Sequence, residues 1–553
     1  MAINRRQSLQ WIAATGTAIS QLGKLQDAQA ATSGDASEVF QHGVASGDPD
    51  QQSVVLWSRV STDADSESVA WMIADDPEFR SIVDEGEVTS SPERDHTVKV
   101  IAIGLKPGAT YYYRFIANNE TSPLGRTKTL PTGVVDRLGI ALASCSNYAF
   151  GYFNAYDAIA KDEAVDLVLH TGDYIYEYGA GEWGDDAGGE LNRRHDPPHE
   201  IVTLDDYRRR HAQYKGDAGS KAMLAAHPMI AFWDDHETTN NPWTGGAGNH
   251  DAETEGDWTA RRDASLKAYF EWMPVREPAA GQALQDYWRS YQFGDLASLI
   301  TLETRHTGRD VQPAYAETDS FSSREDRDRY VAEVLGDPSR RMLSPEVEAH
   351  VRESLAASIE AGQPWRLIGT ASPIARLLIP DLVKGGIDKA AFPPAGDYLI
   401  SFGQWNLPWY NDTWDGYAAA RQSFYKMARE AGSSDLFMLT GDTHNFFANQ
   451  LFTDEGDAVG VEIGTAGISS PGEFLDAGFA PDVVEKIDAL FADGMEDVRW
   501  TNSRHNGYVR IVLSPEAADV TYVGVDTVKS LDYRTIDIHQ ERVIKSGSSL
   551  AYS

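Results

Sequence analysis

The sequence has one cysteine, few cations and no long apolar run, and each shortage excludes a class of protein. Cys145 is the only cysteine among 553 residues, so the chain forms no intramolecular disulfide. No run of about 18 apolar residues is present, so we expect no membrane span. The 48 Lys and Arg are outnumbered by 84 Asp and Glu, which gives a formal charge of −36. This excess of anions disfavours a stable nucleic-acid complex, because binding to phosphates depends on cations.

The remaining composition is that of a folded chain with several domains. Hydrophobic residues make up 42% and charged residues 24%, a globular balance rather than a disordered one. The length allows roughly two to four domains of about 150 residues each. There is no internal repeat and no low-complexity segment, so a repeat architecture is excluded.

The first 30 residues are typical of an export signal. Arg5 and Arg6 precede a short, weakly apolar run over residues 11–19, and Ala28 to Ala30 form a small-x-small cleavage site. This order predicts a twin-arginine signal peptide over residues 1–30. It makes the twin-arginine export machinery a partner and implies a periplasmic or extracellular location. An ordinary amphipathic helix is the alternative interpretation.

Residues 38–131 predict a small antiparallel β-sandwich that precedes the main body. Short β-branched and aromatic runs alternate with turns, at residues 53–60, 68–72, 96–100 and 110–115. Leu105, Pro107, Tyr111 and Tyr113 resemble the corner of fibronectin type III domains. The strand ends of this region carry no cluster of His and Asp, so we expect it to do no chemistry.

From Leu138 onward, apolar strands alternate with longer helical stretches, which predicts an α/β domain over residues 137–526. The expected strands are 138–143, 165–170, 229–233, 296–302, 365–371, 436–440 and 459–463. The expected helices are 204–226, 259–272, 345–361 and 415–431. Residues 237–258 and 376–414 have the composition of long insertions that line a cleft, and residues 527–553 form a C-terminal extension.

Polar side chains gather directly after four of these strands. The segments are 144–148, 172–177, 234–237 and 441–445, which together supply a thiol, carboxylates, a phenol and imidazoles. Each residue alone has an ordinary explanation, as a turn residue, a helix cap or a small buried hydrophobe. Ligands of open α/β sheets bind beyond the carboxyl ends of the strands, so the four segments together predict one site.

Bound cations would explain why several carboxylates gather in one place. Buried together, Asp173, Asp235 and Asp442 would repel one another and take up protons unless cations neutralise them. Carboxylates favour hard cations such as calcium, magnesium or manganese, whereas thiolate and phenolate suit a ferric ion. The residues therefore predict a site with more than one metal.

The same segments resemble the PhoD-type alkaline phosphatases, which belong to the calcineurin-like metallophosphoesterase superfamily. The resemblance covers nearly all of the chain after the signal, in residues 40–49, 56–60, 145–156, 172–178, 233–237, 441–446 and 469–472. It implies an α/β protein in which a fibronectin-III-like β-sandwich precedes a four-layer αββα metallophosphoesterase domain. It also implies Fe³⁺ and Ca²⁺ as cofactors, one iron with one or two calcium ions.

The resemblance assigns roles to individual residues. The implied metal ligands are Cys145, Asp173, Tyr176, Asp235, Asp442 and His444. Asp173 would bridge metals, and His236 would contact the phosphate or protonate the leaving group. Arg305 is added as a cation that could face the substrate, although an ion pair at the surface would explain it equally well. Weaker candidates for metal or substrate contacts are Asp234, Asn240, Asn241, Asn445 and Asn502.

The resulting expectation is an exported alkaline phosphatase that hydrolyses small-molecule phosphate esters with a metal-activated hydroxide. Two alternatives remain open. The first is a phosphodiesterase or phospholipase-D-like enzyme on the same scaffold. The second is an exported calcium-binding adhesion module, which would explain the acidity but would require neither Cys145 nor His236.

Overall fold

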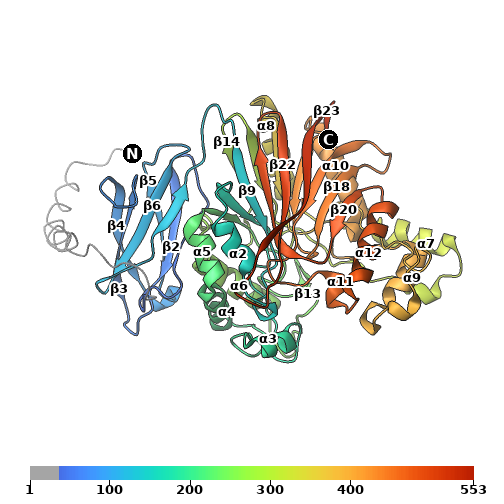
Figure 1. Ribbon diagram of the computed structural model, residues 1–553, viewed down its shortest axis with the longest axis horizontal. Coiled ribbons are helices and arrows are strands. Elements are labelled where there is room, and N and C mark those ends of the chain that lie inside the picture. The colour runs from blue at the N-terminus through green and yellow to red at the C-terminus, as the bar shows by residue number, and fades with distance from the viewer. Residues whose placement is uncertain (1–36) are drawn as a thin grey trace. The chain divides into compact units, whose positions relative to one another are not determined.

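The computed structural model describes residues 37–553, and the predicted signal peptide over residues 1–30 lies outside them. The described residues form sheets of ten, seven, five and two strands together with helices (Figure 1). No helix in this part of the chain combines the length and the apolar character that a membrane crossing requires.

The first strands form the predicted β-sandwich. Its five-stranded sheet contains β3 (Glu67–Ala74), β4 (Ile82–Ser90), β6 (Thr110–Ala117), β7 (Glu120–Thr121) and β8 (Gly125–Lys128). Alternate residues of β6, Tyr111, Tyr113 and Phe115, are buried in the sandwich core, as expected for a strand with one covered face. The Tyr111 hydroxyl accepts a hydrogen bond of 2.7 Å from the Lys106 backbone NH, which closes the corner seen in the sequence.

The second sheet of the sandwich continues into the α/β body. Its strands are β1 (Val44–Gly47), β2 (Ser53–Arg59) and β5 (Thr97–Ile103). Gly47 of β1 pairs with Met229 of β11 (Met229–Ala231), so these strands extend the ten-stranded sheet of the α/β body.

The rest of the ten-stranded sheet combines parallel and antiparallel strands. These are β9 (Leu138–Ala143), β10 (Leu167–His170), β21 (Asn506–Leu513), β22 (Ala517–Val525), β23 (Thr535–Ser546) and β24 (Ser549–Tyr552). The strands β9, β10 and β11 are parallel, and β21 to β24 follow in antiparallel order. Residues 527–553, which the sequence set apart as an extension, thus supply the edge strand β24 and its neighbour β23.

The seven-stranded sheet packs against the ten-stranded one. Its strands are β14 (Arg289–Phe293), β15 (Ala297–Thr301), β16 (Trp365–Gly369), β17 (Leu436–Thr440), β18 (Phe446–Phe452), β19 (Ala458–Gly464) and β20 (Val498–Asn502). The hydrogen bonds that connect the sheets include one from Trp365 Nε1 to the Ser514 carbonyl at 2.6 Å and one from the Tyr522 hydroxyl to the Phe447 carbonyl at 2.8 Å.

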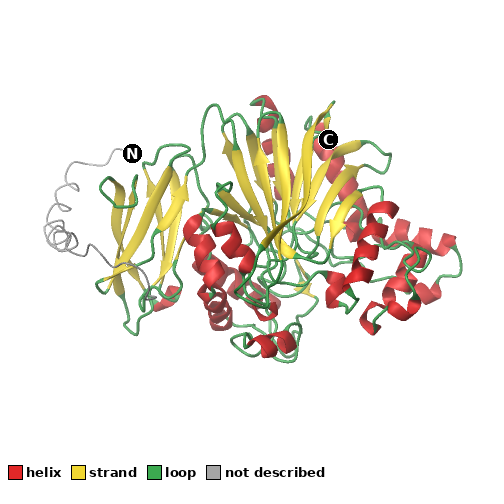
Figure 2. Ribbon diagram, viewed as in Figure 1, coloured by secondary structure: helices red, strands yellow, loops and turns green. Residues whose placement is uncertain are grey.

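Helices cover the outer faces of both sheets, which gives the four layers αββα (Figure 2). One layer contains α2 (Asn154–Ala160), α4 (Leu204–Gly216), α5 (Ala218–Ala226) and α6 (Trp258–Trp272), and the other α8 (Pro345–Glu360) and α10 (Ala418–Glu430). On β17, Phe437 and Leu439 join the core between the sheets, whereas Leu436 and Met438 pack with α8 and α10. The predicted fold class is confirmed.

One expected helix is divided in two. The sequence predicted a single helix over residues 204–226, but Asp217 separates α4 from α5. Asp217 has extended backbone angles, and its carboxylate accepts hydrogen bonds from the NH groups of Gly219 and Ser220. Aspartate is a strong N-cap, so this local bond outweighs the continuous helical periodicity.

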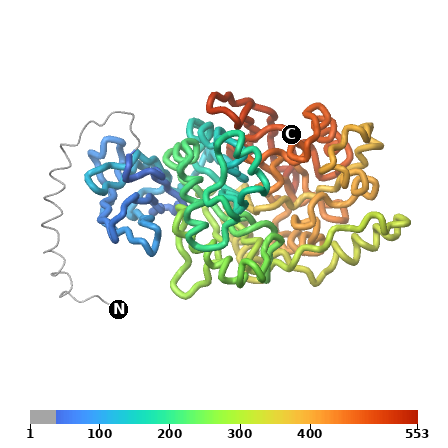
Figure 3. The backbone as a smooth tube through the Cα atoms, turned by 90° about the horizontal axis from the view of Figure 1, so that it is seen from below, coloured from blue at the N-terminus to red at the C-terminus, as the bar shows by residue number. Residues whose placement is uncertain are grey.

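Residues 376–414 and 473–494 pack together around an apolar cluster of their own. The first segment contains α9 (Tyr398–Trp405), and the second contains α11 (Glu473–Asp476) and α12 (Pro481–Gly494). The helix α7 (Arg324–Tyr330) lies beside α9, and Arg327 donates hydrogen bonds to the carbonyls of Trp405 and Asn406 (Figures 1 and 3).

The remaining elements are short. They are α3 (Asp185–Leu191), the pair β12 (Pro242–Trp243) and β13 (Gly246–Ala247), the 3-10 helices η1 (Pro92–Arg94), η2 (Tyr148–Phe150), η3 (Thr318–Ser320), η5 (Lys389–Ala391), η6 (Pro394–Gly396) and η7 (Trp414–Tyr417), and the π-helix η4 (Val331–Leu335).

Lys215 is buried in the body without a hydrogen-bonding partner among the described residues. Its ammonium group lies 4.9 Å from the centre of the Trp57 ring and 4.8 Å from that of Tyr174. Burial, together with the nearby Lys99, lowers the pKa of Lys215 from 10.5 to about 7. The unfolded chain therefore binds a proton more tightly, and this group costs stability at pH 7, a cost that disappears as the pH rises towards 10.5.

We expect Lys215→Met to raise the free energy of unfolding near pH 7 by on the order of 2 kcal/mol, because the lost cation–π contacts offset only part of the burial cost. Thermal unfolding at pH 7 and pH 10 checks this: the advantage of the variant should shrink at the higher pH. Lys161→Met, at a lysine whose side chain is 69% exposed, is the control. A variant less stable than the native chain at pH 7 would contradict the expectation.

Candidate metal centre

The predicted site residues follow the carboxyl ends of β9, β10, β11 and β17. Four of them have left-handed backbone angles: φ is 60° at Cys145, 57° at Asp173, 68° at Asp442 and 58° at His444. This conformation costs a residue with a side chain about 1–2 kcal/mol and is concentrated at functional sites. The strain turns the side chains out of the strands and towards a common point.

Two glycines let these strand ends approach one another closely. At Gly172, where φ is 106°, a Cβ atom would lie 2.4 Å from the backbone nitrogen of Asp234. At Gly441 a Cβ atom would lie 2.3 Å from Ser144 Oγ. No larger residue fits at either position without moving a strand end, so both glycines are needed for the convergence.

A first group of donor atoms belongs to Cys145, Asp173 and His444, whose ligand atoms all lie within 4.8 Å of one another. The thiol of Cys145 is 3.4 Å from Asp173 Oδ2. The Tyr176 hydroxyl contacts both Asp173 and His444, at 3.1 Å from Asp173 Oδ2 and 3.3 Å from His444 Nε2. Ser470 Oγ donates to that hydroxyl at 2.9 Å.

The surroundings of His444 prepare it to act as a ligand. Its Nδ1 lies 3.1 Å from the Pro471 carbonyl, to which it donates, so Nε2 is left as an acceptor facing Tyr176. Burial and the nearby His236 lower the pKa of His444 to about 4, which keeps the ring neutral. The Trp183 ring stacks on the imidazole at 5.6 Å and holds its plane.

A second group consists of Asp173, Asp235 and His236, again with ligand atoms within 4.8 Å of one another. Asp173 belongs to both groups, which is the arrangement a bridging carboxylate requires. His236 Nδ1 lies 2.7 Å from Glu177 Oε2, and its Nε2 lies 3.8 Å from Asp235 Oδ2. The His236 ring also stacks on Tyr176 at 4.3 Å.

Burial and like charges shift the protonation of this cluster. Burial raises the pKa of Asp173 well above its usual value, and Asp235 adds to the rise while His236 opposes it. Burial and Asp173 likewise raise the pKa of the Cys145 thiol. For His236, burial alone would lower the pKa, but Asp235 and Glu177 raise it well above 6.5. The cluster thus holds more acidic groups than its own cations neutralise.

Arg305 does not occupy the position expected for it. The sequence analysis proposed a cation facing the substrate or a surface ion pair, but its guanidinium is 0% exposed and lies among carboxylates. Its Nε donates to Asp234 Oδ1 at 2.6 Å, and its terminal nitrogens lie 3.5 Å from Asp412, 3.9 Å from Asp442 and 4.0 Å from Asp235. Arg305 therefore neutralises and orients these carboxylates. Asp234 and Asp442 both lie beside Arg305. Because the terminal nitrogen that is 3.9 Å from Asp442 is also 4.0 Å from Asp235, Asp442 lies next to the second donor group.

The four asparagines among the weaker candidates differ in the contacts that they make. The side chain of Asn445 is buried, and neither of its polar atoms has a partner among residues 37–553, so it is available to a ligand. Asn241 donates its backbone NH to Asp235, and Asn240 donates its own to Glu177. Asn502 is different, because its side-chain oxygen accepts hydrogen bonds from the backbone of residues 504 and 505 and caps its own loop.

Several residues that support the site were missed in the sequence. Glu177 holds His236, and Glu237 accepts the backbone NH groups of residues 173, 174 and 234, which fixes two strand ends together. Both glutamates lie within the polar segments that follow the strands, so their position in the sequence could have indicated a role in the site. Ser470 lies in the segment 469–472 that contributed to the family resemblance, although no role was assigned to it. Asp412 lies in the long insertion, where no spacing in the sequence marks it.

Comparison with known proteins identifies the family of the chain. The family model of PhoD-like phosphatase matches residues 140–522, and that of the PhoD-like phosphatase N-terminal domain matches residues 26–131. Alkaline phosphatase D of Bacillus subtilis (strain 168) is 34% identical over 505 residues, which cover 87% of this chain and 77% of that protein. A solved structure of PhoD has a TM-score of 0.75 and 30% identity, covering 94% of this chain and 93% of its own.

These matches extend over both the β-sandwich and the α/β body, so they concern the whole described fold rather than a shared module. They favour the enzyme over the adhesion module that the acidity alone allowed. The chain belongs to the PhoD-like phosphatase family, and it is a phosphoric ester hydrolase.

Proposed function

We propose that this hydrolase is a metal-dependent alkaline phosphatase that holds one ferric ion and one or two calcium ions at the strand ends. Cys145, Tyr176 and His444 would hold the iron, Asp173 would bridge, and Asp235 would hold a calcium ion together with Asp442. The observation that carries the proposal is the sharing of Asp173 by two donor groups, each with ligand atoms within 4.8 Å of one another.

The donor set fits these ions. Thiolate, phenolate and imidazole are suited to a ferric ion, and carboxylate and amide oxygens to calcium. The side-chain oxygen of Asn445 is buried without a partner among the described residues, so it is free to act as one of the oxygen ligands. The raised pKa values of Cys145 and Asp173 also fit, because both groups would be protonated unless cations stabilise their charged forms.

The residues around the centre would divide the work of ester hydrolysis. When bound, the cations would lower the pKa of water and offset charge on the phosphoryl group. His236 would hold a proton at Nε2 for the leaving oxygen, because Nδ1 is fixed by Glu177 at 2.7 Å. Arg305 would keep Asp234 and Asp235 oriented. The substrate would be a small phosphate ester.

We further propose that the protein is exported by the twin-arginine route to the periplasm or the cell exterior. The paired arginines and the cleavage site in residues 1–30 support this, and so does the metal centre, because this route carries folded proteins that have already taken up their cofactors.

A visible spectrum and an elemental analysis of the natively exported protein test the metal assignment. We expect iron and calcium together with a broad visible band from the Tyr176 phenolate on iron. Tyr176→Phe should lose the band, whereas Tyr178→Phe, whose ring stacks beside that of Tyr176 at 6.4 Å, should keep it. A colourless and fully active protein without iron would overturn the assignment.

A further inference from the structure

A groove of about 510 Å³ lies on the outer face of β2 and β5, where residues 276–289 approach the sandwich. Val98 and Ala102 of β5 point into the sandwich core, so Lys99 and Ile101, which alternate with them, point outward into this groove. None of the residues of the candidate metal centre lines it. Its volume falls in the range of about 300–1,000 Å³ that is typical of small-molecule sites.

The charge of this groove is opposite to that of the whole chain. It is lined by four cations, Arg94, Lys99, Arg276 and Arg289, and by one carboxylate, Glu277. The cations come from η1, β5, the loop before β14 and β14 itself, so folding brings them together. In a chain of net charge −36, this basic groove is a local reversal of sign.

The carboxylates in reach do not balance the four cations. Glu277 is shared by Arg94 and Lys99, the latter at 3.8 Å. Arg289 lies 3.2 Å from Asp48, whose two oxygens also accept hydrogen bonds from the Tyr291 hydroxyl and the Arg276 backbone NH.

Arg276 has the least compensated charge of the four. Its guanidinium donates only to neutral oxygens, the Asp48 carbonyl at 3.2 Å and Ser53 Oγ at 2.9 Å. Only two carboxylates, Glu277 and Asp48, thus form direct ion pairs with the four cations, while Asp50 and Glu271 act on Arg289 and Lys99 from further away. If these residues served only to hold the structure together, each cation would have its own carboxylate partner. The surplus of positive charge therefore points to an anion from outside the chain.

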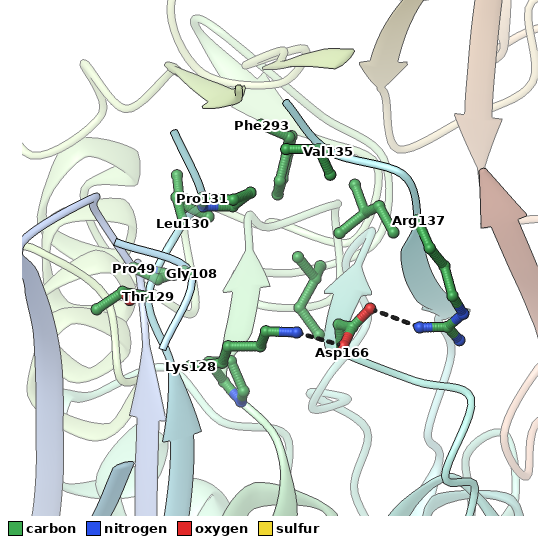
Figure 4. A pocket seen from close by; sticks show the side chains of 13 residues that line it. Pro49, Gly108, Lys128, Thr129, Leu130, Pro131, Val135, Arg137, Asp166 and Phe293 are labelled. Carbon is green, nitrogen blue, oxygen red and sulfur yellow. Dashed lines mark hydrogen bonds and ion pairs between the residues drawn. The ribbon is translucent and has the colours of Figure 1, made fainter. Parts of the chain in front are cut away.

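The neighbouring cavity in Figure 4 shows what a balanced cluster looks like. It measures about 80 Å³, and Lys128 and Arg137 both face it. Asp166 holds both cations, at 2.7 Å and 3.0 Å, across the cavity wall. That cavity is too small for an organic ligand, and its polar groups are occupied by one another. The basic groove differs in both respects.

The floor of the groove is apolar. Its exposed apolar surface comes from Ile101, which is 49% exposed, while the buried Val55 and the half-buried Val88 lie beneath. A bare inorganic anion would leave this apolar surface in water, whereas an anion carried on an alkyl or aryl group would cover it. Arginine presents its donors in a fork that matches the oxygens of phosphate and related oxyanions.

We propose that the basic groove is a second binding site, distinct from the metal centre, for an oxyanion on an apolar body, namely an alkyl or aryl phosphate. The choice of phosphate rests on the chain being a phosphoric ester hydrolase. The site itself rests on the four cations, the two carboxylates and the apolar floor.

Phenylphosphonate, an analogue that is not an ester, tests the proposal on the metal-loaded enzyme. Calorimetric titration counts all sites, and the inhibition constant from activity reports the catalytic centre alone. Ile101→Glu places a carboxylate in the groove without breaking any ion pair. Ile103→Glu, at an isoleucine 62% exposed on the same face of β5 but outside the groove lining, is the matched control.

We expect two sites in the native chain and in Ile103→Glu. In Ile101→Glu the second site should weaken at least tenfold while the inhibition constant stays the same. Arg276→Gln should weaken the same site. A single site that Ile101→Glu leaves unchanged, or equal effects of the two isoleucine variants, would overturn the proposal. If the protein has no metal-dependent activity, the proposed function is refuted. The titration would still detect binding in the groove, so the two proposals can fail separately.

Discussion

Asp173→Asn is expected to lower kcat/KM for a phosphate ester by about a thousandfold, equivalent to about 4 kcal/mol of transition-state stabilisation. Asp173 is the only residue common to both donor groups, and its oxygens contact Cys145, Tyr176 and the His236 backbone. Asparagine keeps the shape but removes the negative charge that would bridge two cations. Steady-state kinetics measures the loss of kcat/KM, and elemental analysis of the same sample measures the loss of bound metal.

The metal content separates this explanation from simple misfolding. We expect the variant to lose iron and calcium together, because one residue serves both donor groups. Asp205→Asn, at a side chain 88% exposed on α4, should keep its metals and its activity. Full activity in the Asp173 variant, or loss of one metal alone, would contradict the bridging role.

His236→Gln is expected to lower kcat by about a hundredfold to a thousandfold, the usual contribution of a positioned general acid. The imidazole lies next to both Asp235 and Asp173 and is held by Glu177. Glutamine can still form a hydrogen bond to Glu177 but cannot deliver a proton. Comparing phenyl phosphate with 4-nitrophenyl phosphate checks this, since the nitrophenolate leaves without protonation.

If His236 protonates the leaving group, its loss should be at least tenfold smaller on the nitrophenyl ester than on the phenyl ester. An equal loss on both substrates would assign His236 to phosphate contact instead. Glu177→Gln should show the same dependence on the leaving group, but with a total loss of about 10-fold to 100-fold, as is typical of a residue that orients another. His199→Gln, at a side chain 61% exposed, is the control.

The elements that could be predicted were those with strong local patterns. The buried strand expected at residues 436–440 is β17, and the helix expected at 259–272 is α6 within one residue. The boundary at Asp217 was missed because one side-chain cap outweighs a continuous apolar period. The strands β21 to β24 were missed as well. Only β21 joins the sheet through a distant partner, β9, and β22 to β24 follow it as consecutive antiparallel neighbours. β23 is largely exposed, so its residues show no buried run.

The residue types of the centre could be predicted because each one follows a strand end. The pairing of those residues could not. The ion pair of Asp442 with Arg305 was not anticipated, and Asp412 approaches the same arginine from an insertion more than a hundred residues away. These contacts depend on how the insertion folds over the sheet edge, which no local spacing encodes.

The sequence by itself determined the α/β class, the strand ends that carry the chemistry and the kinds of ligand they offer, because hydrophobic periodicity and turn residues act over short distances. The four-layer αββα arrangement was implied by the family resemblance. Only the tertiary structure decided that Asp173 is shared between two donor groups, that Arg305 is buried among carboxylates and that four cations of an acidic chain meet in one groove. Such arrangements depend on distances between elements remote in sequence, which are set by the packing of the two sheets and their insertions.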